Sequence, residues 1–229
     1  VLSMLNKPEK NRMRSVSSIL FSLALGSCIS LAASAADHDA HNHDQHKAEA
    51  HHHDHKHTSL AAGEVNHHDS LYHFSANWID QNNSKLTLND FKGQPVIISM
   101  IYGNCRTACP VLVNDARQII KKLNPQQQQA VKVVFVSFDA KHDTPEVLAD
   151  YAEQMDLAQP NWHFLNGSAS DIRTLATLLG IRYREKSDGN FDHSNILTLL
   201  DNEGRIAYRV EGLQQPSESM IKKISALLP

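Results

Sequence analysis

The sequence predicts an α/β domain, a central mixed sheet flanked by helices, preceded by a disordered, histidine-rich tail. Two observations predict it. Across residues 70–229, short apolar runs alternate with helical patterns, which is typical of a layered sheet covered by helices. Eleven of the 15 histidines lie between His38 and His68, in a segment with almost nothing that could pack into a core.

The first half of the domain predicts two buried strands joined by a helix. Residues 95–102 and 131–138 are nearly continuous apolar runs, which favours strands inside a sheet. Residues 107–123 carry apolar side chains at helical spacing, so a helix is expected between these strands.

The second half predicts helices and a closing hairpin. The run Asp143-Thr144-Pro145-Glu146 is typical of a helix start, because a capping side chain precedes proline in the first turn. Gly180 is expected to stop a later helix. The expected elements are helices over residues 143–155, 171–179 and 216–228, and strands over 162–165, 196–200 and 206–210, the last two forming a hairpin.

Composition excludes several classes of protein. The formal charge is −3, from 22 Lys+Arg and 25 Asp+Glu, so no nucleic-acid-binding surface is expected. Three cysteines are too few for a disulfide-dense scaffold. A hydrophobic content of 41 % is too low for a protein that spans a membrane many times.

Residues 1–35 resemble a secretory signal peptide. A basic start is followed by an uncharged stretch, residues 15–36, that ends in Ala33-Ser34-Ala35, a small-x-small cleavage pattern. The alternatives are an uncleaved membrane anchor and lipidation at Cys28. All three predict an exported protein, in the periplasm or tethered to the outer face of the cytoplasmic membrane.

Residues 36–69 predict a disordered metal-binding tail. Low hydrophobicity with a net negative charge favours disorder, and histidine-rich tracts indicate metal binding. Imidazole is the commonest metal ligand, and the affinity order of divalent ions favours Cu(II). A solvated tether without metal is the alternative, and no individual histidine of the tail is assigned as a ligand.

Two cysteines lie at the first predicted strand–helix junction. Cys105 and Cys109 belong to the run Cys105-Arg106-Thr107-Ala108-Cys109-Pro110. Side chains four apart on a helix share a face, so both sulfurs could meet one ion or each other. The helix N-terminus lowers the pKa of a thiol, and soft thiolates select Cu(I) and Zn. Three intervening residues, rather than the two of a thioredoxin-type motif, allow a disulfide but also suit a metal pair.

A third ligand is sought among the four histidines outside the tail, which are His73, His142, His163 and His193. His73 could belong to the tail. His142 is expected on the surface, and His163 is expected to be a structural histidine with satisfied hydrogen bonds. His193 precedes the hairpin and could reach the cysteines, but spacing alone leaves this open.

Three motifs give the domain a resemblance to the Sco/SenC family of copper-binding proteins. They are Cys105-Arg-Thr-Ala-Cys109-Pro, Val136-Ser-Phe-Asp139-Ala-Lys-His-Asp143-Thr-Pro, and Asp192-His193-Ser194 followed by Leu200-Asp201-x-x-Gly204. The resemblance implies a thioredoxin-like fold and one copper ion, Cu(I) or Cu(II), held by Cys105, Cys109 and His193. It makes Asp139 a nearby functional residue, for which the alternative is a strand-end residue that caps its loop.

The resemblance also implies a role in assembling the binuclear copper centre of cytochrome c oxidase. The expected partner is the subunit that carries this centre, or another copper or thiol client. A metallochaperone is expected rather than an enzyme. The alternative is a thiol–disulfide oxidoreductase in which Cys105 and Cys109 are the catalytic pair. Arg106 stands where family members often have proline, and its charge beside the thiolates tilts slightly toward the redox role.

Overall fold

The computed structural model describes residues 59–228. The expected signal peptide and the tail up to residue 58 lie outside the described residues. Within residues 59–228, no helix is long and apolar enough to cross a membrane.

A seven-stranded mixed sheet, in the order β2-β1-β5-β4-β3-β8-β9, forms the centre of the domain. The three middle strands β5, β4 and β3 run parallel, and β8 and β9 add an antiparallel hairpin beside β3. The strands are β1 (Trp78–Asp80), β2 (Lys85–Leu86), β3 (Val96–Ile101), β4 (Lys132–Ser137), β5 (Trp162–Asn166), β8 (Ile196–Leu200) and β9 (Ile206–Glu211). The mixed α/β architecture with a central mixed sheet is therefore confirmed.

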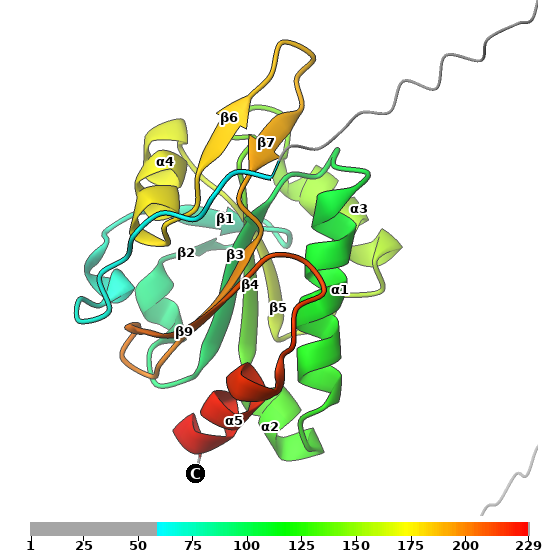
Figure 1. Ribbon diagram of the computed structural model, residues 1–229. Coiled ribbons are helices and arrows are strands. Elements are labelled where there is room, and N and C mark those ends of the chain that lie inside the picture. Colours follow the sequence, from blue (N-terminus) through cyan, green and yellow to red (C-terminus); the bar gives the residue numbers. More distant parts are fainter. Residues whose placement is uncertain (1–58, 229) are drawn as a thin grey trace, which may run out of the picture. The chain divides into compact units, whose positions relative to one another are not determined.

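Helices cover both faces of this sheet. Figure 1 shows α1 and α3 on one side of the sheet and α4 on the other. The shared side of α1 and α3 is the one expected from right-handed crossovers between the parallel neighbours β3 and β4 and the parallel neighbours β4 and β5. The helices are α1 (Ala108–Lys121), α2 (Pro125–Ala130), α3 (Pro145–Gln154), α4 (Ala169–Leu178) and α5 (Glu218–Leu227), with short 3-10 turns η1 (Leu71–His73) and η2 (Leu88–Phe91).

The strands and helices expected from apolar patterns are all present. Every residue of β3 is buried, as expected of a parallel strand covered on both faces. The start of α3 is also as expected: the Thr144 side chain accepts a hydrogen bond from the backbone N–H of Val147, and Pro145 is the first helical residue. Helix α4 begins two residues earlier than expected because Ser168 caps it, accepting from the backbone N–H of Asp171.

The apolar pattern missed the shortest elements. A separate two-stranded sheet pairs β6 (Tyr183–Glu185) with β7 (Phe191–His193). Neither strand is long enough to show an alternating pattern. This small sheet matters because it carries His193.

Residues 59–69, expected to be the end of the tail, lie against the domain. The Leu60 N–H donates to the His193 carbonyl at 3.2 Å, and the Gly63 N–H donates to the Gly180 carbonyl at 2.7 Å. The ring of His67 lies 3.0 Å from the carbonyl oxygen of Ile206. Residues 59–69 are therefore attached to the rest of the domain by hydrogen bonds.

Gly180 ends a helix and also allows another segment of the chain to pack close to its backbone. Its φ of +64° lies in the left-handed region, and a Cβ there would meet the carbonyl oxygen of Gly63 at 2.5 Å. Residues 59–65, called the anchor segment below, thus depend on a glycine at this position to approach the end of α4.

Replacing Gly180 by alanine is expected to destabilise the fold more than replacing Gly189. Both glycines have positive φ, +64° and +77°, but nothing lies within 4 Å of a Cβ at Gly189. Gly189→Ala should therefore cost about 1 kcal/mol for its backbone conformation alone. Gly180→Ala should cost at least about 1 kcal/mol more, because the new methyl group displaces the anchor segment. Urea unfolding of both variants measures the difference, and equal losses would show that the anchor segment is not held at Gly180.

Candidate metal centre

Three buried side chains from distant parts of the chain converge. The sulfurs of Cys105 and Cys109 and a ring nitrogen of His193 all lie within 4.8 Å of one another, and none of the three residues is more than 2 % exposed. His193 Nε2 is 3.7 Å from Cys109 Sγ. No disulfide joins the two cysteines. Two thiols and one imidazole at this spacing form a compact donor set for a soft or borderline metal ion.

Cys105 lies in the loop between β3 and α1, before the helix begins, as the expected helix over residues 107–123 implies. A turn closed by the Cys105 N–H and the Tyr102 carbonyl, at 3.1 Å, brings its side chain back over the helix start. There Cys105 Sγ accepts the backbone N–H of Cys109 at 3.3 Å. Thr107 precedes the helix but makes no side-chain capping bond. The sulfur of Cys105 therefore satisfies one of the unpaired donors of the helix N-terminus.

The surroundings shift the pKa values of the two thiols in opposite directions. The pKa of Cys105 is lowered from its ordinary value, first by a hydrogen bond from the Cys109 thiol, and further by the backbone N–H groups of Cys109 and Thr107. Burial raises the pKa of Cys109, and the negative sulfur of Cys105 raises it further. The two shifts favour a thiolate at Cys105 beside a protonated thiol at Cys109. Arg106 is exposed and is not among the main causes of the lowered pKa, so its expected influence on the thiolate is minor.

His193 is held with one ring nitrogen facing the sulfurs. Its Nδ1 lies 3.1 Å from the Ser194 carbonyl oxygen, which can only accept a hydrogen bond, so Nδ1 carries the proton. Its Nε2 is then the nitrogen with the lone pair, which a metal ion needs. The rings of Phe138 and Tyr102 pack against the imidazole, with centroids at 5.1 and 6.3 Å.

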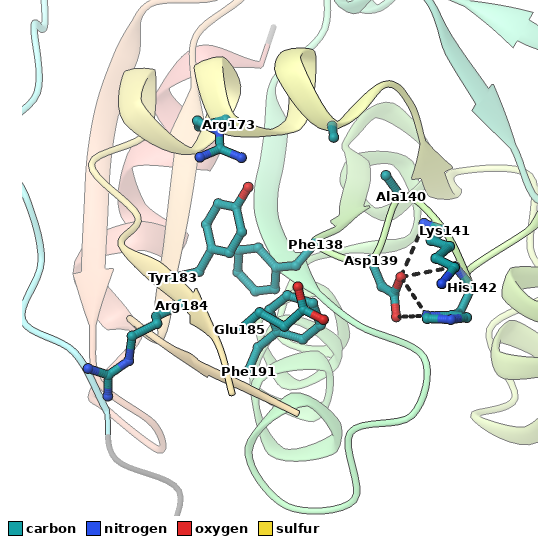
Figure 2. Close-up of a pocket in the computed structure, with 11 residues that line it drawn as sticks. Phe138, Asp139, Ala140, Lys141, His142, Arg173, Tyr183, Arg184, Glu185 and Phe191 are labelled. Carbon is teal, nitrogen blue, oxygen red and sulfur yellow. Dashed lines mark hydrogen bonds and ion pairs between the residues drawn. The ribbon is translucent and has the colours of Figure 1, made fainter. Parts of the chain in front are cut away.

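A cavity of about 510 Å³ lies on the outer side of this aromatic packing. Figure 2 shows the rings of Phe138, Tyr183 and Phe191 together along one part of it, with Asp139 and His142 at another. Phe138 thus contacts His193 and also lines an open surface next to the centre.

Asp139 makes the local hydrogen bonds of a loop-capping residue. Its carboxylate accepts the backbone N–H groups of Lys141 and His142, at 3.1 and 2.9 Å, and lies 2.8 Å from the ring of His142. His142 is exposed, as expected. Asp139 is not one of the three converging side chains.

Asp143 is the functional candidate that sequence reasoning missed. It is 3 % exposed, and its carboxylate accepts the backbone N–H of Gly103 at 2.8 Å and the hydroxyl of Ser137. It thereby ties the loop that carries Cys105 to the end of β4, and its charge contributes to the raised pKa of Cys109. In the sequence, Asp143 belongs to the expected helix start and to the second of the three motifs, and no role was assigned to it. Because Thr144 is the N-cap residue of α3, the Asp143 carboxylate is available to bond elsewhere.

His163 differs in part from expectation. It lies in β5 and packs edge-to-face on Phe91, with ring centroids 5.0 Å apart, so it is structural. Within the described residues, neither ring nitrogen has a hydrogen-bond partner, and the expected satisfied histidine is wrong in that respect. Burial lowers the pKa of His163, which keeps the ring neutral.

Comparison with known proteins places the chain in a family. The family model SCO1/SenC matches residues 66–229. The chain belongs to the SCO1/SenC family. A SCO2-like protein of Rickettsia typhi is 30 % identical over 133 residues, which cover 56 % of this chain and 64 % of the relative. The chain thus matches slightly less than two thirds of that relative's length.

Solved Sco structures share the fold. Bradyrhizobium japonicum ScoI, solved with copper bound, has a TM-score of 0.55 and 22 % identity, covering 67 % of this chain and 97 % of that one. BsSco has a TM-score of 0.58 and 25 % identity, covering 66 % and 90 %. BsSco is described as having a disulfide switch and as a member of the Sco family of cytochrome c oxidase assembly proteins. The thioredoxin-like fold expected from the resemblance is confirmed.

The metal-free, reduced protein should retain one thiolate well below neutral pH. Cys105 has a lowered pKa and Cys109 a raised one, so ultraviolet thiolate absorbance should report one thiolate per chain from about pH 5 to 8. Cys105→Ser should remove this signal across the range. In Cys109→Ser, Cys105 should keep its thiolate to a lower pH than a free cysteine does. A wild-type protein whose thiolate signal vanishes between pH 8 and 7 would contradict the assignment.

Proposed function

We propose that this protein is an exported copper-binding metallochaperone that holds one copper ion through Cys105, Cys109 and His193. The observation that carries the proposal is the convergence of these three donors within 4.8 Å in a member of the SCO1/SenC family. The client we propose is the subunit of cytochrome c oxidase that carries the binuclear copper centre, in keeping with the description of BsSco.

The donor set supports copper as the cargo. Two thiolates suit Cu(I), and adding an imidazole gives a set that also accommodates Cu(II). Copper bound in Bradyrhizobium japonicum ScoI is consistent with this choice. Burial of all three side chains excludes water from the ion, which favours retention until a client displaces a ligand.

Two features favour thiol–disulfide exchange as a second activity of the same centre. The lowered pKa of Cys105 makes it the nucleophile, and the Cys109 thiol is close enough to resolve a mixed disulfide. Against it, Cys105 is only 2 % exposed, so a client disulfide must displace the surrounding loop before attack. This activity should require both cysteines and survive the loss of His193, whereas Cu(II) binding should require all three.

An exported location is part of the proposed function, and residues 1–35 support it. The basic start, the uncharged stretch and the small-x-small ending of residues 1–35 favour a secretory signal, or a membrane tether by retention or through Cys28. Any of these would bring the domain to the compartment in which an exported copper client is assembled.

His193→Ala should weaken Cu(II) binding by about 100-fold and Cu(I) binding by less than about tenfold. The reason is that Cu(I) is satisfied by the two thiolates, whereas Cu(II) needs the imidazole. The measurement is an anaerobic competition titration of the full chain against a chelator specific for each oxidation state.

The chain Cys105→Ser/Cys109→Ser provides the matched control, because it keeps every tail histidine and reports copper bound by the tail alone. His163→Asn is a second control, since it removes a histidine that lies outside the centre. Equal losses of Cu(I) and Cu(II) affinity in His193→Ala would refute the role given to His193. If the native chain binds no more copper than the Cys105→Ser/Cys109→Ser variant, the proposed function is refuted.

A further inference from the structure

Tyr102 directly follows β3 and contacts two of the three residues of the candidate metal centre. Its side chain is 2 % exposed. Its carbonyl oxygen accepts the backbone N–H of Cys105 at 3.1 Å. Its ring packs edge-on against the imidazole of His193, with centroids 6.3 Å apart, and against the ring of Phe191 at 5.1 Å. Tyr102 therefore lies between the loop that supplies a sulfur and the strand that supplies the imidazole.

The hydroxyl of Tyr102 connects this strand to the sulfur. It accepts the backbone N–H of Phe191, and it is hydrogen-bonded to the side chain of Cys105. The side-chain oxygen of Asn190 lies 3.4 Å from it, which is longer than an ordinary O–H···O bond. A tyrosine hydroxyl carries one proton to donate. The sulfur is the stronger acceptor when it is a thiolate, because hydrogen bonds to charged groups are roughly twice as strong as neutral ones.

Copper binding changes the set of hydrogen bonds that this sulfur accepts. In the metal-free pair, the Cys109 thiol donates to the sulfur of Cys105. A metal ion is bound by thiolates, so the Cys109 thiol loses its proton and can no longer donate. The backbone N–H of Cys109, 3.3 Å from the sulfur, and the hydroxyl of Tyr102 keep their protons and remain as donors.

We propose that Tyr102 is a specificity-determining residue that favours Cu(I) over Cu(II) in this centre, because its hydroxyl donates a hydrogen bond to the sulfur of Cys105. The copper preference rests on the proposed function, since it needs copper at the centre. The same hydrogen bond also favours the reduced pair of cysteines over their disulfide when no metal is present.

The preference follows from the electron density on the sulfur. A hydrogen bond draws density away from a thiolate and so weakens its donation to a metal ion. Cu(II) carries the higher charge and depends on this donation more than Cu(I) does. Hydrogen bonding around a cysteine sulfur is accordingly one of the features that tune the reduction potential of a copper site.

The metal-free preference follows from the same bond. Glutathione disulfide oxidises the two thiols to a protein disulfide and is itself reduced to two glutathione thiols, so electrons and protons balance. A sulfur in a disulfide is neutral and only a weak acceptor. The Tyr102 hydroxyl therefore stabilises the reduced pair and opposes this oxidation.

Tyr102→Phe tests the proposal, because it keeps the ring and removes only the hydroxyl. Anaerobic competition titrations of the full chain with Cu(I) and with Cu(II) should show the ratio of Cu(II) to Cu(I) affinity rising about tenfold, the size expected for a hydrogen bond to a charged group. The sulfur-to-Cu(II) charge-transfer band should move to longer wavelength. Without metal, the equilibrium constant for disulfide formation with glutathione disulfide should also rise about tenfold.

Two other Tyr→Phe variants are matched controls. Tyr151 is a buried residue whose hydroxyl, within residues 59–228, has no hydrogen-bond partner. Tyr183 lies in β6, and its ring packs on those of Phe138 and Phe191 (Figure 2). Tyr151→Phe and Tyr183→Phe should both leave the affinity ratio, the charge-transfer band and the disulfide equilibrium at their native values.

Two results would overturn the role of Tyr102 alone. One is a Tyr102→Phe chain that binds copper with the native affinity ratio and band position, and the other is an equal change in Tyr151→Phe. A native chain that binds no more copper than Cys105→Ser/Cys109→Ser would overturn the proposed function and, with it, the copper preference. In that case an unchanged disulfide equilibrium in Tyr102→Phe would also refute the hydrogen bond to the thiolate.

Discussion

The hydrogen bond from the backbone N–H of Cys109 to the sulfur of Cys105, at 3.3 Å, is the interaction on which the centre depends. A helix start needs acceptors for its unpaired N–H groups, and here a sulfur supplies one where Thr107 does not. The same bond holds the sulfur over α1 and favours its anionic form. Formation of the helix start therefore also positions the Cys105 sulfur and favours its thiolate form. The Asp143 carboxylate holds the loop that carries Cys105, because it accepts the Gly103 N–H.

The third donor reaches the centre by a different route. His193 lies in β7, outside the seven-stranded sheet, so its position depends on aromatic packing against Phe138 and Tyr102 and on the hydrogen bond that fixes its tautomer. The anchor segment adds two hydrogen bonds at the end of the same strand, from the Leu60 N–H to the His193 carbonyl and from the Ser194 hydroxyl to the Ala61 carbonyl. His193, in a strand of only three residues, is thus held both by aromatic packing and by the anchor segment.

Apolar patterns predicted the centre of the fold because β3 and β4 are buried on both faces and their sequences are nearly continuous apolar runs. They failed at β6 and β7, which are too short for a pattern, and at the anchor segment, which is attached mainly through backbone groups that no side-chain pattern reports. In the site, residue chemistry located the two cysteines, whereas the resemblance was needed to select His193. Asp143 was missed because its partners, Gly103 and Ser137, are adjacent only in the folded chain.

In the proposed function, copper lies between two sulfurs and one imidazole of the domain rather than among the tail histidines. X-ray absorption of the full chain loaded with one equivalent of Cu(II) tests it most directly. The structure predicts two sulfur scatterers and a histidine imidazole, with the sulfur contribution absent from Cys105→Ser/Cys109→Ser. A spectrum of nitrogen and oxygen scatterers alone in the native chain, identical to that of the double variant, would contradict the account.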